Sequence, residues 1–341
     1  GFATFGPNAA AAIIEGSKVF SKNLMLKYNI PTAEYKVFDN PCDVLTYIKE
    51  KNEFPAVIKA DGLALGKGVI IPENLEEAEK GVHEIMEDKI FGESGNHVVV
   101  EEFLTGPEVS VLAFTDGKCV KPMVSSMDHK RALDGDKGLN TGGMGTVSPN
   151  PYYTADIAKE CMEKIFLPTI DAMNKEGRTF KGCLYFGLML TPKGPKVIEY
   201  NCRFGDPETQ VVLPRLKTDI IDIFEAINSG TLAELDIEWA DEACACVIAA
   251  SGGYPKSYPK GIEITGLENG QKDGVIVYHA GTAIKDGKLV TSGGRVLGVT
   301  ALGSDLQQAL DKAYAALDEI HFDNMHFRHD IGKKALAALN K

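Results

Sequence analysis

Apolar positions recur at helical or strand spacing along most of the chain, and the two periods alternate from one end of the sequence to the other. Helical spacing predicts helices over residues 8–29, 41–51, 75–86, 154–175 and 218–228. Alternating or continuous apolar runs predict strands over residues 35–38, 98–100, 181–191 and 195–200, with two more around a glycine-rich loop within 55–71. The pattern therefore favours a mixed α/β protein built from short elements.

Two regions differ from this regular alternation. Residues 108–116 and 119–127 predict a hairpin around Asp116-Gly117, and a polar, glycine-rich loop runs from there to Gly145. A long loop without structure of its own usually has a function. Beyond Cys244 the sequence predicts strands over residues 244–250, 274–279, 281–284, 288–291 and 295–300, then a helix over 304–319. We interpret this last part as a separate α+β lobe.

Composition narrows the class of protein. The 341 residues carry a net charge of −12, which argues against a general nucleic-acid binder. No apolar run approaches the ~18 residues that a membrane span requires, and we expect no signal peptide. Seven scattered cysteines are typical of a reducing compartment such as the cytoplasm. The chain opens on Gly1 without a methionine, and we interpret this start as the end of a domain whose earlier part is missing.

The stretch VIEYNCRFGDPETQ, residues 197–210, carries the clearest candidate chemistry. Glu199 and Asn201 lie two residues apart at the end of a strand, so their side chains point the same way. A carboxylate and an amide oxygen in this arrangement suit Mg²⁺ held on a nucleotide's phosphates. Arg203 follows as a fork for a phosphate or a carboxylate. Taken alone, a Glu-x-Asn pair is more often a strand end with a solvated acidic turn.

A glycine-rich loop, residues 61–68, supplies a candidate phosphate site. Gly66 and Gly68 let the backbone approach an anion, and Lys67 between them adds a positive charge. The spacing excludes a Walker A loop, and the strand that follows excludes a dinucleotide-binding turn. The loop predicts a hairpin flap over phosphates, with Lys59 on the preceding strand as a second ligand. An ordinary hairpin with a loose glycine turn is the alternative.

An acidic pair followed by two apolar residues suits an adenine slot. The backbone of Phe103 and Leu104 could bond the base edge, and Glu101, beside Glu102, could accept from the exocyclic amine. Glu108 could accept from a ribose hydroxyl. Acidic residues between a strand and a turn are otherwise commonly just solvated.

In order and content these pieces resemble the ATP-grasp fold, and within it the glycinamide ribonucleotide synthetase family. The resemblance runs over nearly the whole chain. Its segments are FGP, EGSK with Lys22 after it, IPTAEY, VIKADGLALGKGV, EEFL, MDHKR, LNTGGMG, VIEYNCRFGDPETQ, AASGGYP, HAGT and GGRVLGVTALG. The combination of DHKR, NTGGMG and NCRFGDPETQ is specific to this family.

The resemblance implies an ATP-dependent ligation of glycine to 5-phosphoribosylamine in purine biosynthesis, through a glycyl phosphate. It implies Mg²⁺ or Mn²⁺ on Glu199 and Asn201, and phosphate charge neutralised by Lys22, Lys59 and Lys67. It assigns the acyl-acceptor side to Asp128, Lys130 and Arg203. It also divides the chain into a remnant of an N-terminal domain with a linking helix (1–38), a small ATP-grasp lobe (39–105), a central lobe with the metal site (106–242) and a C-terminal α+β domain (243–341).

Two departures from the family pattern bear on these expectations. The strand before Glu-x-Asn, residues 184–190, offers no further acidic metal ligand, as in this family generally. The family also begins with a nucleotide-fold-like domain, whose glycine-rich segment helps bind phosphoribosylamine, and we expect that this sequence lacks it. The missing domain, or fused domains of the same pathway, are possible partners.

Three questions stay open from the sequence. His129 in the DHKR segment could shuttle a proton or serve only to orient its neighbours. The activity could belong to another purine-pathway ATP-grasp ligase, using bicarbonate or formate. The chain could also be an ATP-binding fragment that is inactive without its N-terminal domain.

Overall fold

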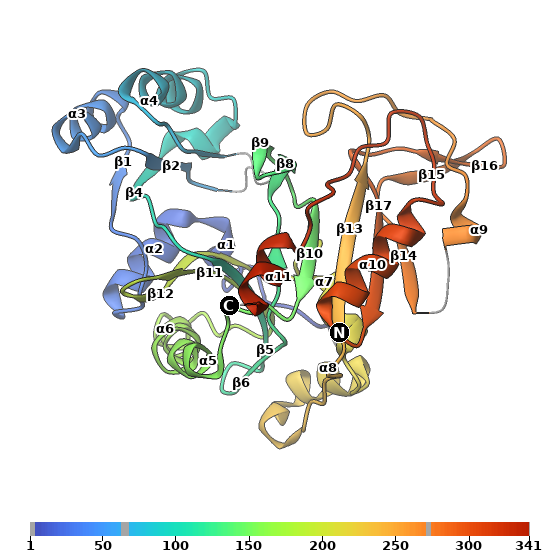
Figure 1. The fold of residues 1–341 in the computed structure, drawn as a ribbon. Coiled ribbons are helices and arrows are strands. Elements are labelled where there is room, and N and C mark those ends of the chain that lie inside the picture. Colours follow the sequence, from blue (N-terminus) through green and yellow to red (C-terminus); the bar gives the residue numbers. More distant parts are fainter. Residues whose placement is uncertain (1–3, 63–67, 271–273, 341) are drawn as a thin grey trace.

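The computed structural model describes residues 4–62, 68–270 and 274–340. Gly66 and Lys67, which we expected at the tip of the flap, lie outside the described residues. Figure 1 shows three groups of elements: a small lobe with α3 and α4, a central lobe around β5, β11 and β12, and a C-terminal sheet around β13 and β17. None of the helices in the described parts is long and apolar enough to cross a membrane.

The small lobe is a four-stranded antiparallel sheet covered on one side by helices. Its strands, in spatial order, are β1 (Tyr35–Phe38), β4 (Val98–Glu102), β2 (Ala56–Ala60) and β3 (Val69–Ile70). Its helical elements are α3 (Pro41–Lys51), α4 (Leu75–Val82), a π-helical turn (His83–Glu87) and a 3₁₀ turn (Gly92–Asn96). Local signals explain why α3 has the predicted bounds: the Asn40 side chain accepts from the Cys42 amide, Pro41 opens the helix, and Asn52 ends it in the left-handed region.

The central lobe contains a second antiparallel sheet. Its strands, in spatial order, are β12 (Gly194–Asn201), β11 (Gly182–Thr191), β5 (Glu108–Thr115) and β6 (Val120–Pro122). The predicted helix over 154–175 is continuous but contains a π-helical turn, so it comprises α5 (Ala155–Cys161), the turn (Met162–Phe166) and α6 (Leu167–Lys175). Buried Ile165, Phe166 and Ile170 pack it against Phe186 and Leu188 of β11.

The predicted helix over residues 8–29 is interrupted. It forms α1 (Ile13–Gly16) and α2 (Lys18–Lys27), because Ser17 between them is extended. The Ser17 hydroxyl accepts a hydrogen bond from the Phe20 amide at 3.0 Å, which starts the second helix. The break brings the first turn of α2 to face the candidate site described below.

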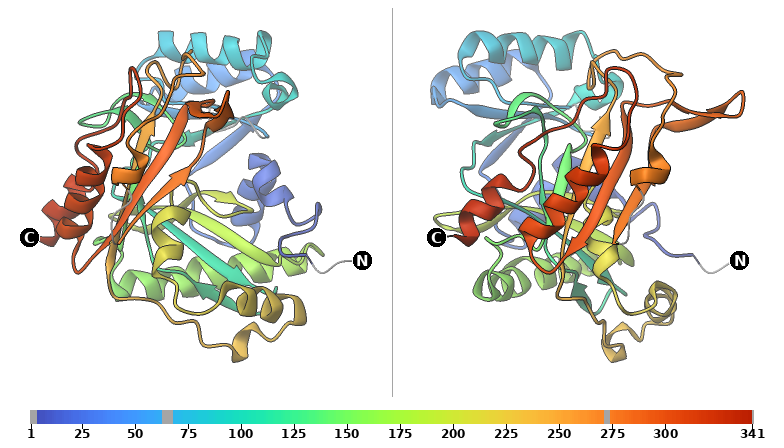
Figure 2. Two further views of the ribbon diagram at one scale, coloured as in Figure 1. Left: turned by 90° about the vertical axis from the view of Figure 1, so that its right-hand side faces the viewer. Right: turned by 45° about the vertical axis from the view of Figure 1, so that its right-hand side comes forward.

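The C-terminal sheet also draws strands from earlier in the chain. Its order is β14 (Val275–His279), β17 (Arg295–Gly303), β13 (Ala243–Ala250), β10 (Gly145–Ser148) and β7 (Met127–Asp128). Buried Leu306, Ala309 and Leu310 pack α10 (Leu306–Leu317) on this sheet, and Figure 2 shows the helix against the strands. Because β7 and β10 come before residue 243, the sheet joins both sides of the domain boundary that we predicted, and that boundary stays a prediction.

Shorter elements complete the described chain. They are α7 (Thr209–Val212), a 3₁₀ turn (Leu213–Arg215), α8 (Ile220–Ser229), a second 3₁₀ turn (Leu232–Glu234), α9 (Leu267–Gly270), the hairpin of β15 (Thr282–Lys285) and β16 (Lys288–Thr291), and α11 (Lys333–Leu339).

The glycine-rich stretch after Asp128 is not a loop without structure, so that prediction was wrong. It contains a hairpin of β8 (Arg131–Leu133) and β9 (Lys137–Asn140). Gly135 (φ 69°) and Asp136 (φ 53°) both adopt the left-handed backbone that such a turn requires. The hairpin was missed because its strands are short and polar, and every residue of β9 is exposed. In Figure 1 it lies between the small lobe and the C-terminal sheet.

Candidate active site

The small and central lobes meet where β2 approaches β12. The Lys59 ammonium donates to the Ile198 carbonyl at 3.1 Å, which ties the two strands together. The segment before β1 runs along the same strand, since Thr32 donates to the Val197 carbonyl at 2.8 Å. The strand that leads into the glycine-rich loop therefore contacts the strand that carries Glu199 and Asn201.

Glu101 lies between two buried lysines. Its carboxylate is 2.9 Å from the Lys22 ammonium and 3.1 Å from the Lys59 ammonium. Burial lowers the pKa of Lys22 to about 8, and the charge of Glu101 limits the shift. Two ammonium groups thus converge on one carboxylate at the edge of the site. In this arrangement Glu101 faces the lysines, while its predicted bond to a base amine stays a prediction.

The chain between β4 and β5 forms the predicted hinge. Glu102 forms an ion pair with Lys196 of β12, and its carboxylate accepts from the Glu34 amide at 3.2 Å. Burial works against the charge of Glu102, but the bond from Lys196 lowers its pKa overall. Phe103 is 42% exposed and Leu104 is partly buried. The hinge therefore offers accessible backbone and an apolar surface next to a fixed carboxylate.

Lys130 joins two acidic residues from different strands. Its ammonium is 3.2 Å from the Glu108 carboxylate on β5 and 3.8 Å from the Glu199 carboxylate on β12. Glu108 is the main cause of the raised pKa of Lys130. Burial by itself would raise the pKa of Glu199. The nearby ammonium groups of Lys130, Lys59 and Lys18 outweigh this effect, and the pKa is lowered overall. Glu199 is therefore ionised and lies among positively charged side chains.

Asn201 and Arg203 lie just beyond Glu199. The Arg203 guanidinium is 3.5 Å from the Asn201 side-chain oxygen and is otherwise 57% exposed. Glu15 of α1 accepts from the Cys202 amide at 2.6 Å and approaches Arg203 at 3.7 Å. Glu15 thus holds the turn after β12 in place. Sequence reasoning missed this role, because nothing local to Glu15 indicates its distant partner.

The donor set at the end of β12 fits a magnesium-type ion. Glu199 supplies an ionised carboxylate and Asn201 an amide oxygen on the same strand face, and both are hard ligands. No cluster of three or more His, Cys, Asp or Glu side chains suited to a metal occurs among the described residues. Mg²⁺ commonly takes only one or two protein ligands together with phosphate and water, so a nucleotide would complete the shell.

Asp128 lies next to a buried carboxylate that the sequence did not reveal. Its Oδ1 accepts from the His129 amide at 2.7 Å, and burial together with the charge of Glu208 raises its pKa. Glu208 accepts from the Tyr185 hydroxyl at 3.1 Å and from Ser110 at 3.3 Å. Burial raises the pKa of Glu208 as well. Asp128 and Glu208, two neighbouring carboxyl groups with raised pKa values, therefore lie near Lys130.

Gly143 in the NTGGMG segment is required by its surroundings. Its φ of +112° lies in the region that favours glycine. A Cβ there would come within 2.4 Å of Pro207 Cδ and 2.7 Å of Asp128 Oδ1. The segment therefore packs directly on Asp128 and on the turn after β12, which brings the two motifs that the sequence singled out into contact.

His129 uses both ring nitrogens within the protein. Nδ1 donates to the Gly145 carbonyl at 3.0 Å, and Nε2 accepts from the Gly332 amide at 3.1 Å. Burial lowers the pKa of His129 to about 4, so the ring is neutral at pH 7. Of the two roles left open by the sequence, this geometry favours orientation over proton transfer.

Lys18 and Arg295 are further residues that the sequence analysis did not assign. Lys18 donates to the Gly62 carbonyl at 2.8 Å, and burial followed by the charge of Lys59 lowers its pKa. Arg295 donates to the Gly142 carbonyl at 2.7 Å and to Asp206 at 2.9 Å. Both lie in segments of the family resemblance, EGSK and GGRVLGVTALG, which is the one signal that could have found them.

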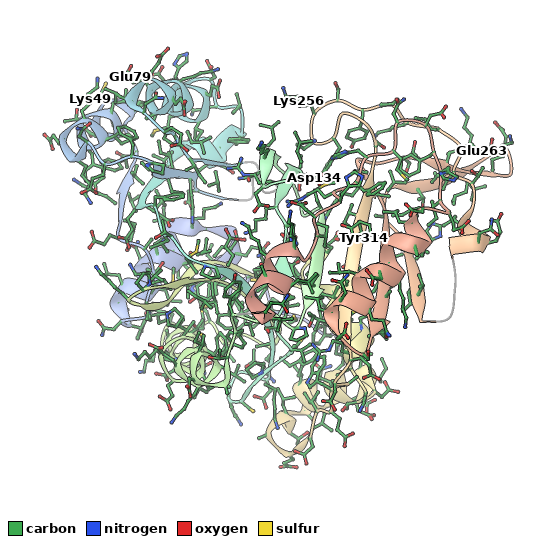
Figure 3. The ribbon with its side chains drawn as sticks, viewed as in Figure 1. Lys49, Glu79, Asp134, Lys256, Glu263 and Tyr314 are labelled. Atoms are coloured by element: carbon green, nitrogen blue, oxygen red, sulfur yellow. The ribbon has the colours of Figure 1, made fainter. Side chains whose placement is uncertain are left out.

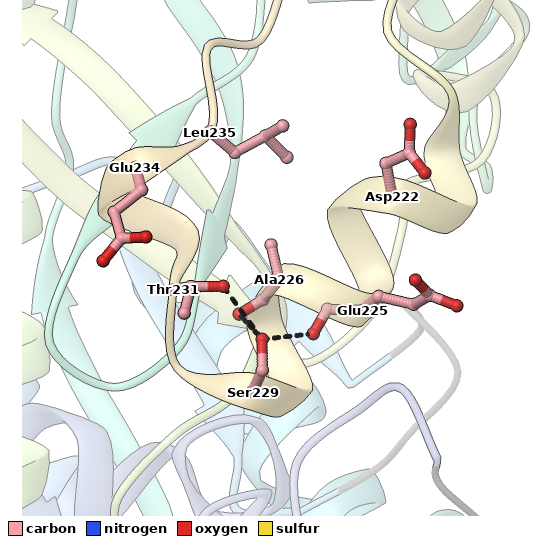
Figure 4. A pocket seen from close by; sticks show the side chains of 7 residues that line it. All are labelled: Asp222, Glu225, Ala226, Ser229, Thr231, Glu234 and Leu235. Carbon is pink, nitrogen blue, oxygen red and sulfur yellow. Dashed lines mark hydrogen bonds between the residues drawn. The ribbon is translucent and has the colours of Figure 1, made fainter.

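A separate pocket of about 360 Å³ lies between α8 and the 3₁₀ turn after it (Figure 4). It is lined by Asp222, Glu225, Ala226, Ser229, Thr231, Glu234 and Leu235. The Ser229 hydroxyl bonds to the Glu225 carbonyl at 2.8 Å and lies 2.9 Å from the Thr231 hydroxyl. None of these residues reaches the lysine and carboxylate cluster, so this pocket is not the candidate active site.

Comparison with known families accounts for most of the chain. A model described as phosphoribosylglycinamide synthetase, ATP-grasp (A) domain, matches residues 16–209, and one for the C domain of the same synthetase matches residues 244–334. A phosphoribosylamine–glycine ligase of Caldanaerobacter subterraneus is 50% identical over 97% of this chain and 79% of that protein. A trifunctional purine biosynthetic protein adenosine-3 of Gallus gallus is 51% identical over 100% of this chain and 34% of that protein.

Solved structures agree with the family models. A phosphoribosylamine–glycine ligase from Thermotoga maritima matches with a TM-score of 0.87 and 37% identity, over 96% of this chain and 81% of that one. A biotin carboxylase domain from Hydrogenobacter thermophilus, solved with MgADP, matches with a TM-score of 0.72 and 15% identity, over 96% of this chain and 70% of that one. The second match is a likeness of fold alone. The predicted ATP-grasp fold is confirmed.

Proposed function

The chain belongs to the phosphoribosylamine–glycine ligase family, and we propose that its candidate active site joins glycine to 5-phosphoribosylamine with the hydrolysis of ATP to ADP and phosphate. The product is glycinamide ribonucleotide, an intermediate of purine biosynthesis. One observation carries the proposal: the Lys59–Ile198 contact brings the buried lysines to the strand of Glu199 and Asn201. This is the arrangement that a triphosphate with its metal requires.

In the first step a carboxylate oxygen of glycine attacks the γ-phosphorus of ATP. The bond between this phosphorus and the oxygen that bridges it to the β-phosphate breaks, so that ADP departs and glycyl phosphate forms. Phosphoryl transfer depends on positioning and charge neutralisation more than on covalent help from the protein. Lys22 and Lys59, held by Glu101, place two positive charges at the phosphates. Lys67, outside the described residues, would add a third.

Glu199 and Asn201 would hold Mg²⁺, or Mn²⁺, which accepts the same oxygen ligands. When bound, the ion offsets the negative charge that builds up on the phosphate oxygens. The chain's own contribution is an ionised Glu199 with Lys130 at 3.8 Å, which leaves the carboxylate available for an additional cation.

In the second step the amine of 5-phosphoribosylamine attacks the acyl carbon, the C–N bond forms and phosphate leaves. Lys130 is placed to neutralise the departing phosphate. Arg203, with an exposed guanidinium, is placed to hold a substrate anion. Asp128, whose pKa is raised by burial and by Glu208, can take up the proton that the amine releases.

The hinge after β4 is the proposed nucleoside site. Phe103 and Leu104 offer a backbone edge and an apolar face for adenine next to Glu102. Glu108 is proposed to accept from a ribose hydroxyl while it also pairs with Lys130 at 3.2 Å. ATP would therefore span from the hinge to the lysines along β12.

The wider setting is also a proposal. All seven cysteines are free thiols, as expected in the cytoplasm. The chain covers 34% of a trifunctional relative, and this relative supports fusion to other enzymes of the pathway as one arrangement of the ligase. An N-terminal domain of the kind that the family carries would then help to bind phosphoribosylamine.

The decisive experiment measures glycinamide ribonucleotide and ADP formed from ATP, glycine and 5-phosphoribosylamine. We expect product only when all three substrates are present. Phosphate release that depends on bicarbonate or formate instead of glycine would contradict the proposal and indicate a different purine-pathway ligase. If the chain binds ATP but forms no product, and the N-terminal segment of a relative restores product formation when it is added, the chain is an ATP-binding fragment that is inactive without this segment.

A further inference from the structure

Lys130 is held from behind by a segment that is distant in sequence. Its ammonium faces Glu108 and Glu199, at 3.2 and 3.8 Å. The residues on either side of it are bound from the C-terminal part of the chain. The Gly332 amide donates to His129 Nε2 at 3.1 Å, and the Arg328 guanidinium donates to the Arg131 carbonyl at 3.1 Å. We refer to residues 326–334 as the C-terminal clasp.

Arg328 is the centre of the clasp. It is 1% exposed, although it carries a full charge. Its guanidinium donates to Asp330 at 2.7 and 3.0 Å and is 2.9 Å from Asp136 in the hairpin turn. The guanidinium contacts four acceptor atoms here, both oxygens of Asp330, one of Asp136 and the Arg131 carbonyl, whereas a lysine ammonium has only three N–H donors. The position therefore requires arginine.

The clasp follows the β8–β9 hairpin residue by residue. His326 Nε2 donates to the Ala132 carbonyl at 2.7 Å, and the His329 amide donates to Asp134 at 2.8 Å. The Gly135 amide donates to Asp330 at 2.7 Å. These bonds bind nearly every residue of the outgoing strand and the turn, while the Lys130 side chain points the other way.

The clasp is anchored to the C-terminal sheet by the backbone pairing of His326 with Ala250 of β13, and to helix α10 by Tyr314. The Tyr314 hydroxyl, on α10, donates to the Arg328 carbonyl at 2.7 Å and accepts from the Ile331 amide at 3.1 Å. Figure 3 labels Tyr314 on its helix and Asp134 on the hairpin side of the clasp. A continuous path of hydrogen bonds therefore runs from α10 to the backbone around Lys130.

The hairpin has little to hold it in place by itself. Its register comprises only the pairs Arg131–Asn140 and Leu133–Lys137, and Leu133 and Leu139 are exposed. An isolated two-stranded hairpin is marginally stable in water. Thr141 donates to the Lys130 carbonyl from its amide and its hydroxyl, both at 2.8 Å, and the clasp adds the bonds that hold residues 131–136 beyond it. Without the clasp we expect the distance between the Lys130 ammonium and Glu199 to vary more.

We propose that the C-terminal clasp, through Arg328 and His129, positions Lys130 for the acyl-transfer step, so that Arg328 is a positioning residue of the ligation. This inference rests on the proposed function for the step that Lys130 serves. It couples a residue near the C-terminus to a charge in the candidate active site, through contacts of Arg328 with Arg131, Asp136 and Asp330.

The first test compares Arg328→Ala and Arg328→Lys with Lys288→Ala. Lys288 forms an exposed ion pair with Glu263 in the same domain, so it is a matched control. We expect kcat to fall about 100-fold in Arg328→Ala, because a small displacement of a catalytic charge costs that much. Arg328→Lys should recover part of the lost kcat, and Lys288→Ala should keep full activity. In both Arg328 variants the dissociation constant of ATP·Mg²⁺ should change less than about twofold. Equal losses of kcat and ATP affinity would overturn the proposal.

A double-mutant cycle separates positioning from general damage. If Arg328 acts through Lys130, Arg328→Ala should have little further effect on kcat when Lys130 is already alanine. Independent effects that multiply in the double variant would contradict the proposal. If the kcat of Lys130→Ala is too low to measure, the cycle uses Lys130→Arg in its place.

Hydrogen exchange gives a readout that does not depend on turnover. The amides of His129, Thr141 and Met144 are bonded within this region, at 2.9, 2.8 and 2.8 Å. In Arg328→Ala, or in Arg328→Lys where the alanine variant does not fold, we expect faster exchange at these amides and unchanged exchange in β11. Unchanged protection at all three would overturn the proposal. If the wild-type chain has no ligase activity, the proposed function is refuted. The hydrogen-exchange comparison would still test whether Arg328 holds the backbone around Lys130.

Discussion

Lys22 and Glu101 form a buried ion pair, with ammonium and carboxylate 2.9 Å apart and side chains only 2% and 4% exposed. Lys59 approaches the same carboxylate at 3.1 Å, so two positive charges share one negative charge. Such an excess of buried positive charge is costly in a free protein unless an anion can enter. The pair therefore indicates where the triphosphate belongs, and it makes the site testable through stability as well as activity.

Replacing Glu101 with glutamine should destabilise the free protein. The change removes the counter-charge of Lys22 and Lys59, and breaking a buried pair typically costs about 3 kcal/mol or more. Denaturant unfolding measures the effect. The matched control is Glu263→Gln, which removes an exposed ion pair with Lys288 and should change the free energy of unfolding by less than about 0.5 kcal/mol. Equal stability of the two variants would argue against a buried lysine cluster.

ATP binding should weaken as the pH rises through the pKa of Lys22. That pKa is lowered to about 8, chiefly by burial, and the phosphates bind the charged ammonium. We therefore expect the affinity to fall by up to about tenfold per pH unit above pH 8. Calorimetry at several pH values measures this, and Lys22→Met should bind weakly with no such dependence.

Folding stability should respond to Lys22 in the opposite direction. Between about pH 8 and the ordinary value of 10.5, the unfolded chain retains a proton that the folded chain has released. The lowered pKa therefore makes the free energy of unfolding rise with pH in this window, relative to Lys22→Met. The same slope in both proteins would show that Lys22 is not desolvated as described.

Replacing Glu199 with alanine should abolish turnover and leave the fold intact. Glu199 is the proposed negatively charged metal ligand at the end of β12, so its loss should lower kcat by at least about 100-fold. Glu79→Ala, which removes an exposed pair with Lys49 at 2.9 Å (labelled in Figure 3), should retain full activity. Full activity in Glu199→Ala would remove the metal assignment, and circular dichroism checks the fold.

Gly143→Ala should impair both stability and activity. The added Cβ would lie 2.4 Å from Pro207 Cδ and 2.7 Å from Asp128 Oδ1, on a backbone with φ +112°. We expect a loss of about 2 kcal/mol and at least about a tenfold lower kcat, because Asp128 must move. Gly177→Ala is the control: it has φ +68° with nothing within 4 Å, so it should cost about 1 kcal/mol at most and leave kcat unchanged. Similar kcat values for the two variants would contradict the packing described.

Local signals in the sequence predicted much of the fold. The helix over 41–51 and the strand over 35–38 have the predicted bounds, because caps, proline and apolar spacing act within a few residues. The β8–β9 hairpin and the break at Ser17 were missed. In both places a turn or a cap with few apolar neighbours decided the structure, and hydrophobic periodicity carries no such information.

The amino-acid sequence by itself determined most of the element types and the family resemblance, and it supplied the candidate site residues, from Lys59 to Glu199. Tertiary structure alone decided which charges face one another: Glu101 against two lysines, Glu208 behind Asp128, and Arg328 behind Lys130. The physical reason is range. Helix caps and strand alternation are set by near neighbours, whereas a buried ion pair forms only when folding has brought distant segments together and removed the water between them.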